Sequence, residues 1–184
     1  MVPGVPRQYR RIIDGEKILI GGREWQVIMG YGHAPEHASL FCKDLRVLIS
    51  GDMLLPRIST NVSVFDADPD ADPLGLYLAS LDEYLPLPDD ALVLPSHGKP
   101  FTGMKPRIGQ LKAHHDERLA ETLDACKKPA TAREIVPVLF RRELDIHQLT
   151  FAMGEAIAHL NYLLRRGKLH RQLCDDGVLR FSVV

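Results

Sequence analysis

Three short apolar segments of this chain each run directly into a turn that contains glycine and either histidine or aspartate. Residues 30–37 read Gly-Tyr-Gly-His-Ala-Pro-Glu-His, residues 49–53 read Ile-Ser-Gly-Asp-Met, and residues 94–100 read Leu-Pro-Ser-His-Gly-Lys-Pro. Side chains in turns that follow strands can converge on a ligand while the sheet holds them in place. The pattern predicts a sheet with these turns close together at one edge.

Taken singly, each turn also has an ordinary explanation. A loop histidine such as His33 or His97 is often only a polar loop residue, and an aspartate after a strand, such as Asp52, often caps a turn. Neutral imidazole is also the commonest protein ligand of zinc-like ions, and a carboxylate at a strand end can bind or bridge metals. Each turn alone leaves both interpretations open.

The order and spacing of the three turns together resemble the C-terminal half of the metallo-β-lactamase superfamily. That family has a TPGH-type turn, a strand ending in GD and a final GHG-type turn, and this chain departs from the first by having Tyr-Gly before the histidine. The resemblance implies that His33 binds one metal, that His97 binds a second, and that Asp52 bridges both as the catalytic carboxylate. His37 would hydrogen-bond to a substrate or a ligand, although a role in the turn itself is an equal alternative.

The cofactor that this resemblance implies is a pair of divalent ions. Histidines with a carboxylate fit Zn(II) best and also suit Mn(II) or Fe(II). The implied reaction is attack of a metal-bridged hydroxide on an ester, thioester, lactam or phosphodiester bond of a small-molecule substrate. The family resemblance therefore predicts a metal-dependent hydrolase.

The rest of the chain resembles one subgroup, the β-lactamase-like hydrolases with a C-terminal winged-helix domain. The resemblance rests on residues 54–64, on the helix that starts at residues 72–74, and on residues 131–135 and 158–163 of the tail. It implies an α+β fold in which residues 1–103 form the C-terminal half of an αββα sandwich. Residues 104–184 would form a small winged-helix domain.

The HxHxDH segment that is the hallmark of the superfamily does not occur in these 184 residues. We therefore expect a chain that starts after the first half of the sandwich and leaves each ion with two protein ligands, fewer than the three of catalytic zinc sites. Metal binding should be weak or absent and activity impaired. The missing half should expose apolar surface, which a partner or a homodimer would cover. The alternative function is a non-catalytic binding or interaction fragment.

Hydrophobic periodicity divides the chain into a strand-rich part and a helical part. The patterns predict strands at 17–20, 25–29, 38–42, 46–50 and 91–94 and helices at 74–85, 108–126, 132–140 and 149–166, with a final hairpin around residues 175–177. Thr131 and Glu134 form a predicted capping box, and Pro137 is expected to kink or shorten its helix. His114 and His115 are expected at a helix surface or between domains, and His159 in a buried position.

Composition narrows the functional classes. The net charge of -1 gives no field that favours nucleic acid or an anionic membrane, and no segment is long and apolar enough to span a bilayer. Residues 149–164 of the predicted helix 149–166 contain no lysine or arginine, and only Arg165 and Arg166 follow at its end, which makes a winged-helix nucleic-acid binder the less favoured alternative. Three widely spaced cysteines and an N-terminal segment without an apolar signal region predict reduced thiols in a cytoplasmic protein.

Overall fold

Five strands form one sheet in the order in which they follow each other along the chain. In this computed structural model, which describes residue 4 and residues 7–184, the first three pairings are antiparallel and the last is parallel. The N-terminal segment, for which the sequence predicts no apolar signal region, lies partly outside the described residues. The strands are β1 (Lys17–Ile20), β2 (Arg23–Gly30), β3 (His37–Cys42), β4 (Val47–Gly51) and β5 (Leu92–Pro95). All five lie at or within a few residues of their predicted positions.

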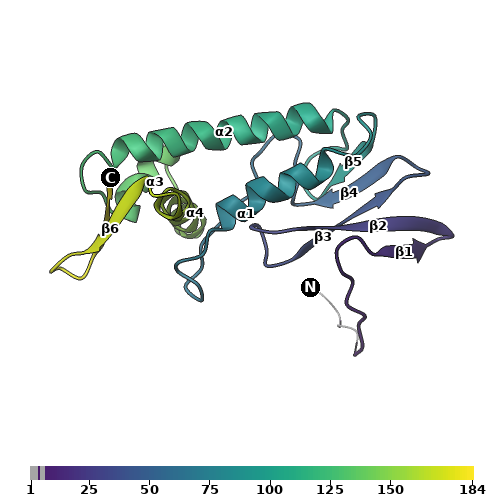
Figure 1. Ribbon diagram of the computed structural model, residues 1–184, viewed down its shortest axis with the longest axis horizontal. Helices are drawn as coiled ribbons and strands as arrows, with labels where there is room; N and C mark the ends of the chain where they lie inside the picture. The colour runs from purple at the N-terminus through teal and green to yellow at the C-terminus, as the bar shows by residue number, and fades with distance from the viewer. Residues whose placement is uncertain (1–3, 5–6) are drawn as a thin grey trace.

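Helices cover one face of this sheet (Figure 1). They are α1 (Pro73–Ser80), which continues into the 3-10 turn η1 (Leu81–Tyr84), and the long helix α2 (Met104–Ala125). Because successive side chains of a strand point to opposite faces, Ile28, Phe41, Leu48 and Val93 all point toward the helices and belong to the core. The β4–β5 crossover through α1 therefore holds the sheet against its helical layer.

The opposite face of the sheet is also apolar. The strand register places Leu40 beside Ile49 and Ile49 beside Leu94, while Val27, beside Leu40 at the β2 end of the row, is fully buried. Within residues 7–184 no helix lies over this row (Figure 1), and Ile49 and Leu92 are each 39% exposed. The apolar surface that the sequence predicts is therefore present on the helix-free face.

The C-terminal part contains α3 (Ala132–Leu139), α4 (Ile146–Arg165) and a hairpin of β6 (Leu169–Leu173) and β7 (Leu179–Val183). The capping box is present, because Thr131 accepts from the main-chain N–H of Glu134 and the Glu134 side chain accepts from that of Thr131. Pro137 lies inside α3, which ends two residues later at Leu139. This part of the chain therefore consists of two helices followed by a hairpin, and its assignment as a winged-helix domain stays a prediction.

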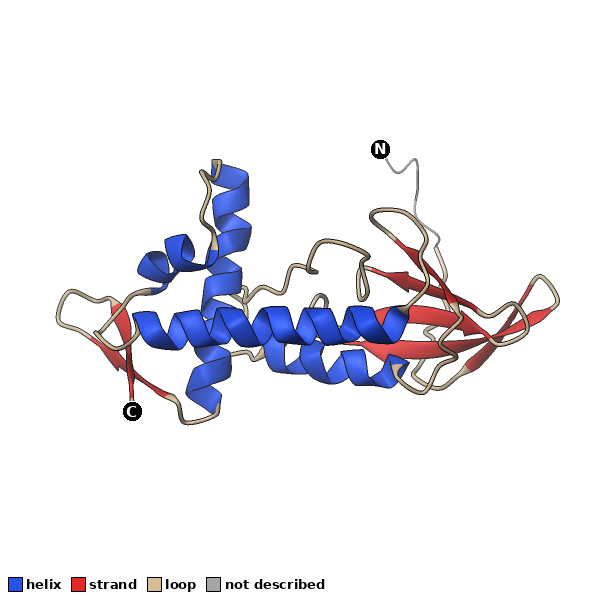
Figure 2. Cartoon of the chain, turned by 90° about the horizontal axis from the view of Figure 1, so that it is seen from above, coloured by secondary structure: helices blue, strands red, loops and turns tan. Residues whose placement is uncertain are grey.

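Helix α2 connects the two parts of the molecule (Figure 2). It packs against η1 near the sheet and against α3 and α4 further along. It begins at Met104 rather than at the predicted residue 108. The division of the chain into domains at residues 103 and 104 stays a prediction. The described part of the chain contains no helix that is both long and apolar enough to cross a membrane.

Candidate metal site

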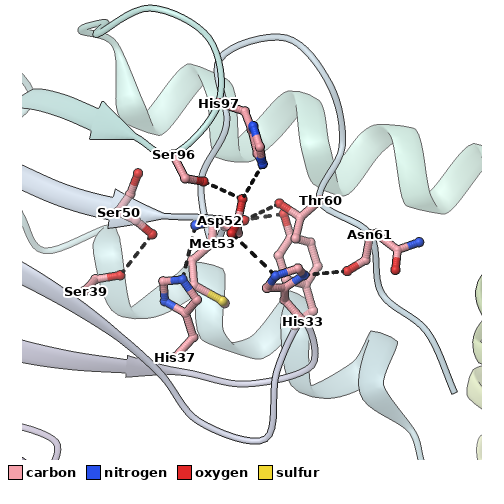
Figure 3. Close-up of polar contacts among 11 residues, drawn as sticks. His33, His37, Ser39, Ser50, Asp52, Met53, Thr60, Asn61, Ser96 and His97 are labelled. Carbon is pink, nitrogen blue, oxygen red and sulfur yellow. Dashed lines mark hydrogen bonds and ion pairs between the residues drawn. The ribbon is translucent and has the colours of Figure 1, made fainter. Parts of the chain in front are cut away.

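The three predicted residues His33, Asp52 and His97 lie together at one edge of the sheet (Figure 3). His33 is in the turn after β2, Asp52 follows β4 and His97 follows β5. Strands β2 and β4 both run antiparallel to β3, and β5 is parallel to β4, so all three end at the same edge. His33 Nε2 lies 3.6 Å from Asp52 Oδ2, and His97 Nε2 lies 3.4 Å from Asp52 Oδ1.

The orientation of His33 follows from a main-chain contact. Its Nδ1 lies 2.8 Å from the carbonyl oxygen of Asn61, and since a carbonyl can only accept, Nδ1 carries the proton. In the neutral imidazole Nε2 then presents a lone pair to the Asp52 carboxylate. Two acceptors that face each other repel until a cation lies between them. The geometry of this pair therefore fits a metal ion.

Asp52 is fixed mainly through its backbone. Its N–H donates to His37 Nε2 at 3.1 Å, and its carbonyl oxygen accepts from the Thr60 hydroxyl. The Ser96 hydroxyl donates to Oδ1, the carboxylate oxygen nearest His97. The side chain of Asp52 is 28% exposed, so the carboxylate is held in place and still reachable.

His37 supports Asp52 rather than facing the space between the other residues. Burial, and then the neighbouring His33, lower the pKa of His37, which favours the neutral form that can accept from Asp52 N–H. The ring lies directly on Gly51, whose φ is +54°, and a Cβ there would be 2.3 Å from it. Only glycine meets both requirements at this position.

Two open cavities flank the site. One of about 540 Å³ lies beside His97 and has Arg57, Lys99 and Phe101 in its lining. The other, of about 300 Å³, lies beside His33 and is largely apolar, with Val64 among its lining residues. His97 itself is 68% exposed. The carboxylate–imidazole cluster is therefore accessible from both sides.

Across the part of the chain that the structure describes, no group of three or more histidine, cysteine, aspartate or glutamate residues is arranged to hold one ion. Each carboxylate oxygen of Asp52 faces one imidazole, so an ion on either side would have two ligands from this chain. The chemistry of the donors fits a divalent ion, although their number is below that of a complete catalytic zinc site.

The other histidine cluster of the molecule lies away from this edge. His115 and His159 are fully buried between α2 and α4, with His115 Nδ1 3.4 Å from His159 Nε2. His159 Nδ1 also lies 2.8 Å from the carbonyl oxygen of Glu155. The buried position of His159 agrees with the sequence-based expectation, whereas His115, expected at a helix surface or between domains, is fully buried because it faces α4. Neither residue joins the candidate site.

Sequence reasoning did not identify Thr60, Asn61 and Ser96 as parts of the site. Thr60 contacts a main-chain atom of Asp52 and Asn61 contacts His33 through its own carbonyl, so neither contact depends on a recognisable motif. Ser96 precedes His97 directly, and that adjacency is the one signal that could have indicated it.

Comparison with known families gives matches to both parts of the chain. A model described as "Metallo-beta-lactamase superfamily" matches residues 3–97, and one described as "Metallo-beta-lactamase-like, C-terminal domain" matches residues 119–184. The first covers slightly more than half of the chain and includes His33, Asp52 and His97.

Similar proteins agree with these family matches. A β-lactamase domain protein from Burkholderia ambifaria is 59% identical, with a TM-score of 0.96 over 100% of this chain and 55% of its own. A metallo-β-lactamase family protein from Thermus thermophilus is 31% identical, with a TM-score of 0.84 over 97% and 56%. "Probable metallo-hydrolase YqjP" of Bacillus subtilis (strain 168) is 31% identical over 80% of this chain and 47% of its own length. The chain thus spans about half the length of these relatives.

Proposed function

This chain belongs to the metallo-β-lactamase superfamily, and on that premise we propose that it is the C-terminal part of a metal-dependent hydrolase. The bond cleaved would be of the ester, thioester, lactam or phosphodiester class. The observation that carries the proposal is the single carboxylate of Asp52, which has one imidazole at each of its oxygens. The Bacillus subtilis relative's name, a probable metallo-hydrolase, agrees with this class of activity.

In the proposed site His33 and Asp52 would hold one ion, and Asp52 and His97 the other. Bound ions, with zinc the best fit to these donors, would supply Lewis acidity and lower the pKa of water toward neutrality. The remaining ligands would come from outside these 184 residues, which contain no HxHxDH segment. The activity of the chain alone is therefore expected to be weak.

The residues around His33 and Asp52 would hold these metal ligands in place rather than transfer protons. The Asn61 carbonyl selects the Nδ1–H tautomer of neutral His33, whose Nε2 is turned toward Asp52, and His37 and Thr60 hold the Asp52 main chain from two sides. Preorganised ligands of this kind lower the cost of assembling a site. A substrate would reach the carboxylate through the cavities beside His33 and His97.

A second copy of the chain is the partner that we propose for the helix-free face of the sheet. That face is a continuous apolar row through Leu40, Ile49 and Leu94, and such a surface is usually covered in solution. We also propose a cytoplasmic location, because Cys42, Cys126 and Cys174 are free thiols.

Hydrolysis assays with zinc-loaded chain test the proposed activity. Chromogenic ester, thioester, lactam and phosphodiester substrates would be compared for the wild type and for Asp52→Asn, with Asp66→Asn as the matched control in an exposed loop. Turnover that requires both zinc and Asp52 supports the proposal. Turnover that is equal in the wild type and Asp52→Asn, or absent from both, favours the non-catalytic fragment.

That alternative rests on one specific observation. Each Asp52 oxygen faces one imidazole, which gives each ion two ligands from the described chain. A site with two ligands per ion can remain empty and leave a fragment whose function is to bind a partner.

A further inference from the structure

A short segment, Thr60–Val64, separates the candidate site from helix α4. At its start the Thr60 hydroxyl contacts Asp52 and the Asn61 carbonyl contacts His33. At its end the N–H of Val64 donates to the carbonyl of Gly154 at 3.1 Å. The segment is therefore bonded to the site on one side and to the C-terminal helix on the other.

Asn61 makes contacts in both directions. Its carbonyl accepts from His33 Nδ1, while its side-chain Nδ2 donates to Glu155 Oε2 at 3.3 Å. Its Oδ1 accepts from the Ser63 hydroxyl at 2.8 Å, so both ends of the carboxamide are engaged. A change in the position of the Asn61 side chain would therefore also move the Asn61 main-chain carbonyl, which holds His33.

Helix α4 approaches the segment closely. A Cβ on Gly154 would lie 2.7 Å from Ser63 Cβ, a distance that leaves no room for any larger residue. The next residue, Glu155, is the only carboxylate within the sequence of α4. It lines a cavity of about 230 Å³ together with Asn61, Arg142 and Gln148.

We propose that Glu155 is a positioning residue for His33, acting through Asn61. The Glu155 carboxylate fixes the Asn61 carboxamide, the Asn61 carbonyl fixes the Nδ1–H form of His33, and Nε2 is thereby aimed at Asp52. The C-terminal helices thus set the geometry of a site that is built on the sheet. The meaning of this for catalysis rests on the proposed function, but the effect on the His33 imidazole does not.

The test is the tautomer of His33 in metal-free chain, read from long-range ¹H–¹⁵N NMR of the imidazole. In Glu155→Ala the minor, Nε2–H form of His33 is expected to rise about fivefold, the size of effect that losing one hydrogen bond gives. Glu155→Gln retains an oxygen acceptor and should keep the wild-type tautomer. Glu117→Ala, at an exposed position of α2, is the matched control and should change nothing.

Asn61→Ala keeps the main-chain carbonyl and removes the side-chain contacts to Glu155 and to Ser63, so it should raise the Nε2–H form of His33 at least as much as Glu155→Ala. If Glu155→Ala does not fold, Asn61→Ala tests in its place whether the Asn61–Glu155 contact positions His33. An unchanged His33 tautomer in a folded Glu155→Ala or Asn61→Ala variant overturns the proposal, as does Glu155→Gln behaving like Glu155→Ala. Zinc binding, measured separately, tests the proposed function. If the chain does not bind zinc, the His33 tautomer still decides whether Glu155 positions His33.

Discussion

His115 and His159 are the residues whose charge state depends most strongly on the fold. Burial, followed by the neighbouring His159, lowers the pKa of His115 to about 3, and burial lowers the pKa of His159 to about 4. Glu155 is displaced in the opposite sense, since burial raises its pKa to about 7 against the hydrogen bond from Asn61. These three groups therefore make stability depend on pH between about 3 and 7.

We predict that acidification destabilises the chain through the two histidines. Their folded pKa values lie below the unfolded value of 6.5, so their full contribution is present above pH 6.5 and is lost as the pH falls to about 4 for His159 and about 3 for His115. Each contributes about 1.4 kcal/mol per pH unit while it is protonated only in the unfolded state. Glu155 offsets part of this, because its raised pKa makes its contribution fall as the pH rises through 7.

Urea unfolding at pH 8, 6.5, 5 and 4 measures this dependence. His115→Met should flatten the loss on the acid side, and Glu155→Gln should steepen it, because the offset is removed. His170→Met is the control at an exposed histidine and should follow the wild type. An equal slope in His115→Met and the wild type would contradict the assignment.

The residues of the site were predictable where they belong to motifs. His33, Asp52 and His97 stand in turns directly after strands, and their proximity follows once the strand directions are known. Asn61 was not predictable, because its contact with His33 is made by a main-chain atom that every residue has. The contact of Glu155 spans 94 residues of sequence, and local patterns carry no information at that distance.

At the level of elements, the approach of α4 to the Thr60–Val64 segment depends on Gly154. Glycine in a helix interior costs about 1 kcal/mol relative to alanine, so its presence there needs a packing reason. The distance of 2.7 Å that would separate an alanine Cβ at this position from Ser63 Cβ supplies that reason. Gly109, in the interior of α2, has nothing within 4 Å of the same position and makes a matched control.

Gly154→Ala should therefore destabilise the chain, and Gly109→Ala should stabilise it. Overpacking typically costs about 1–3 kcal/mol, which exceeds the gain of about 1 kcal/mol in helix propensity. At Gly109 only the propensity gain applies. Thermal unfolding of both variants checks this, and a rise in Tm for Gly154→Ala would mean that α4 does not pack tightly on the segment.

Element types were predictable because periodicity and capping residues mark them, whereas exact starts were less so. Helix α4 begins at Ile146 rather than at residue 149, because the Asp145 side chain accepts from the N–H of Gln148 and caps an earlier turn. The predicted helix 74–85 changes to a 3-10 turn at Leu81, a difference that hydrophobic spacing does not encode.

At the scale of the whole molecule, the sheet has helices on one apolar face and none of the described helices on the other (Figure 1). We predict that the chain forms a dimer through the helix-free face. Ile49→Lys places a charge in the middle of that face and should give a monomer in sedimentation velocity. Ile146→Lys, at a position that is 87% exposed on α4, should remain dimeric.

A wild-type chain that sediments as a monomer at all concentrations would contradict the dimer. A monomeric Ile146→Lys variant would instead place the interface on α4.

His33, Asp52 and His97 are proposed to form one metal half-site, and we would test this by a zinc titration followed by NMR of the histidine side chains. Because imidazole signals report binding even when it is weak, millimolar zinc should shift or broaden His33 and His97 selectively. The exposed His147 and His170 serve as internal controls, and Asp52→Asn should abolish the response. Signals of His33 and His97 that stay unchanged at several millimolar zinc, or that respond equally in Asp52→Asn, would contradict the half-site.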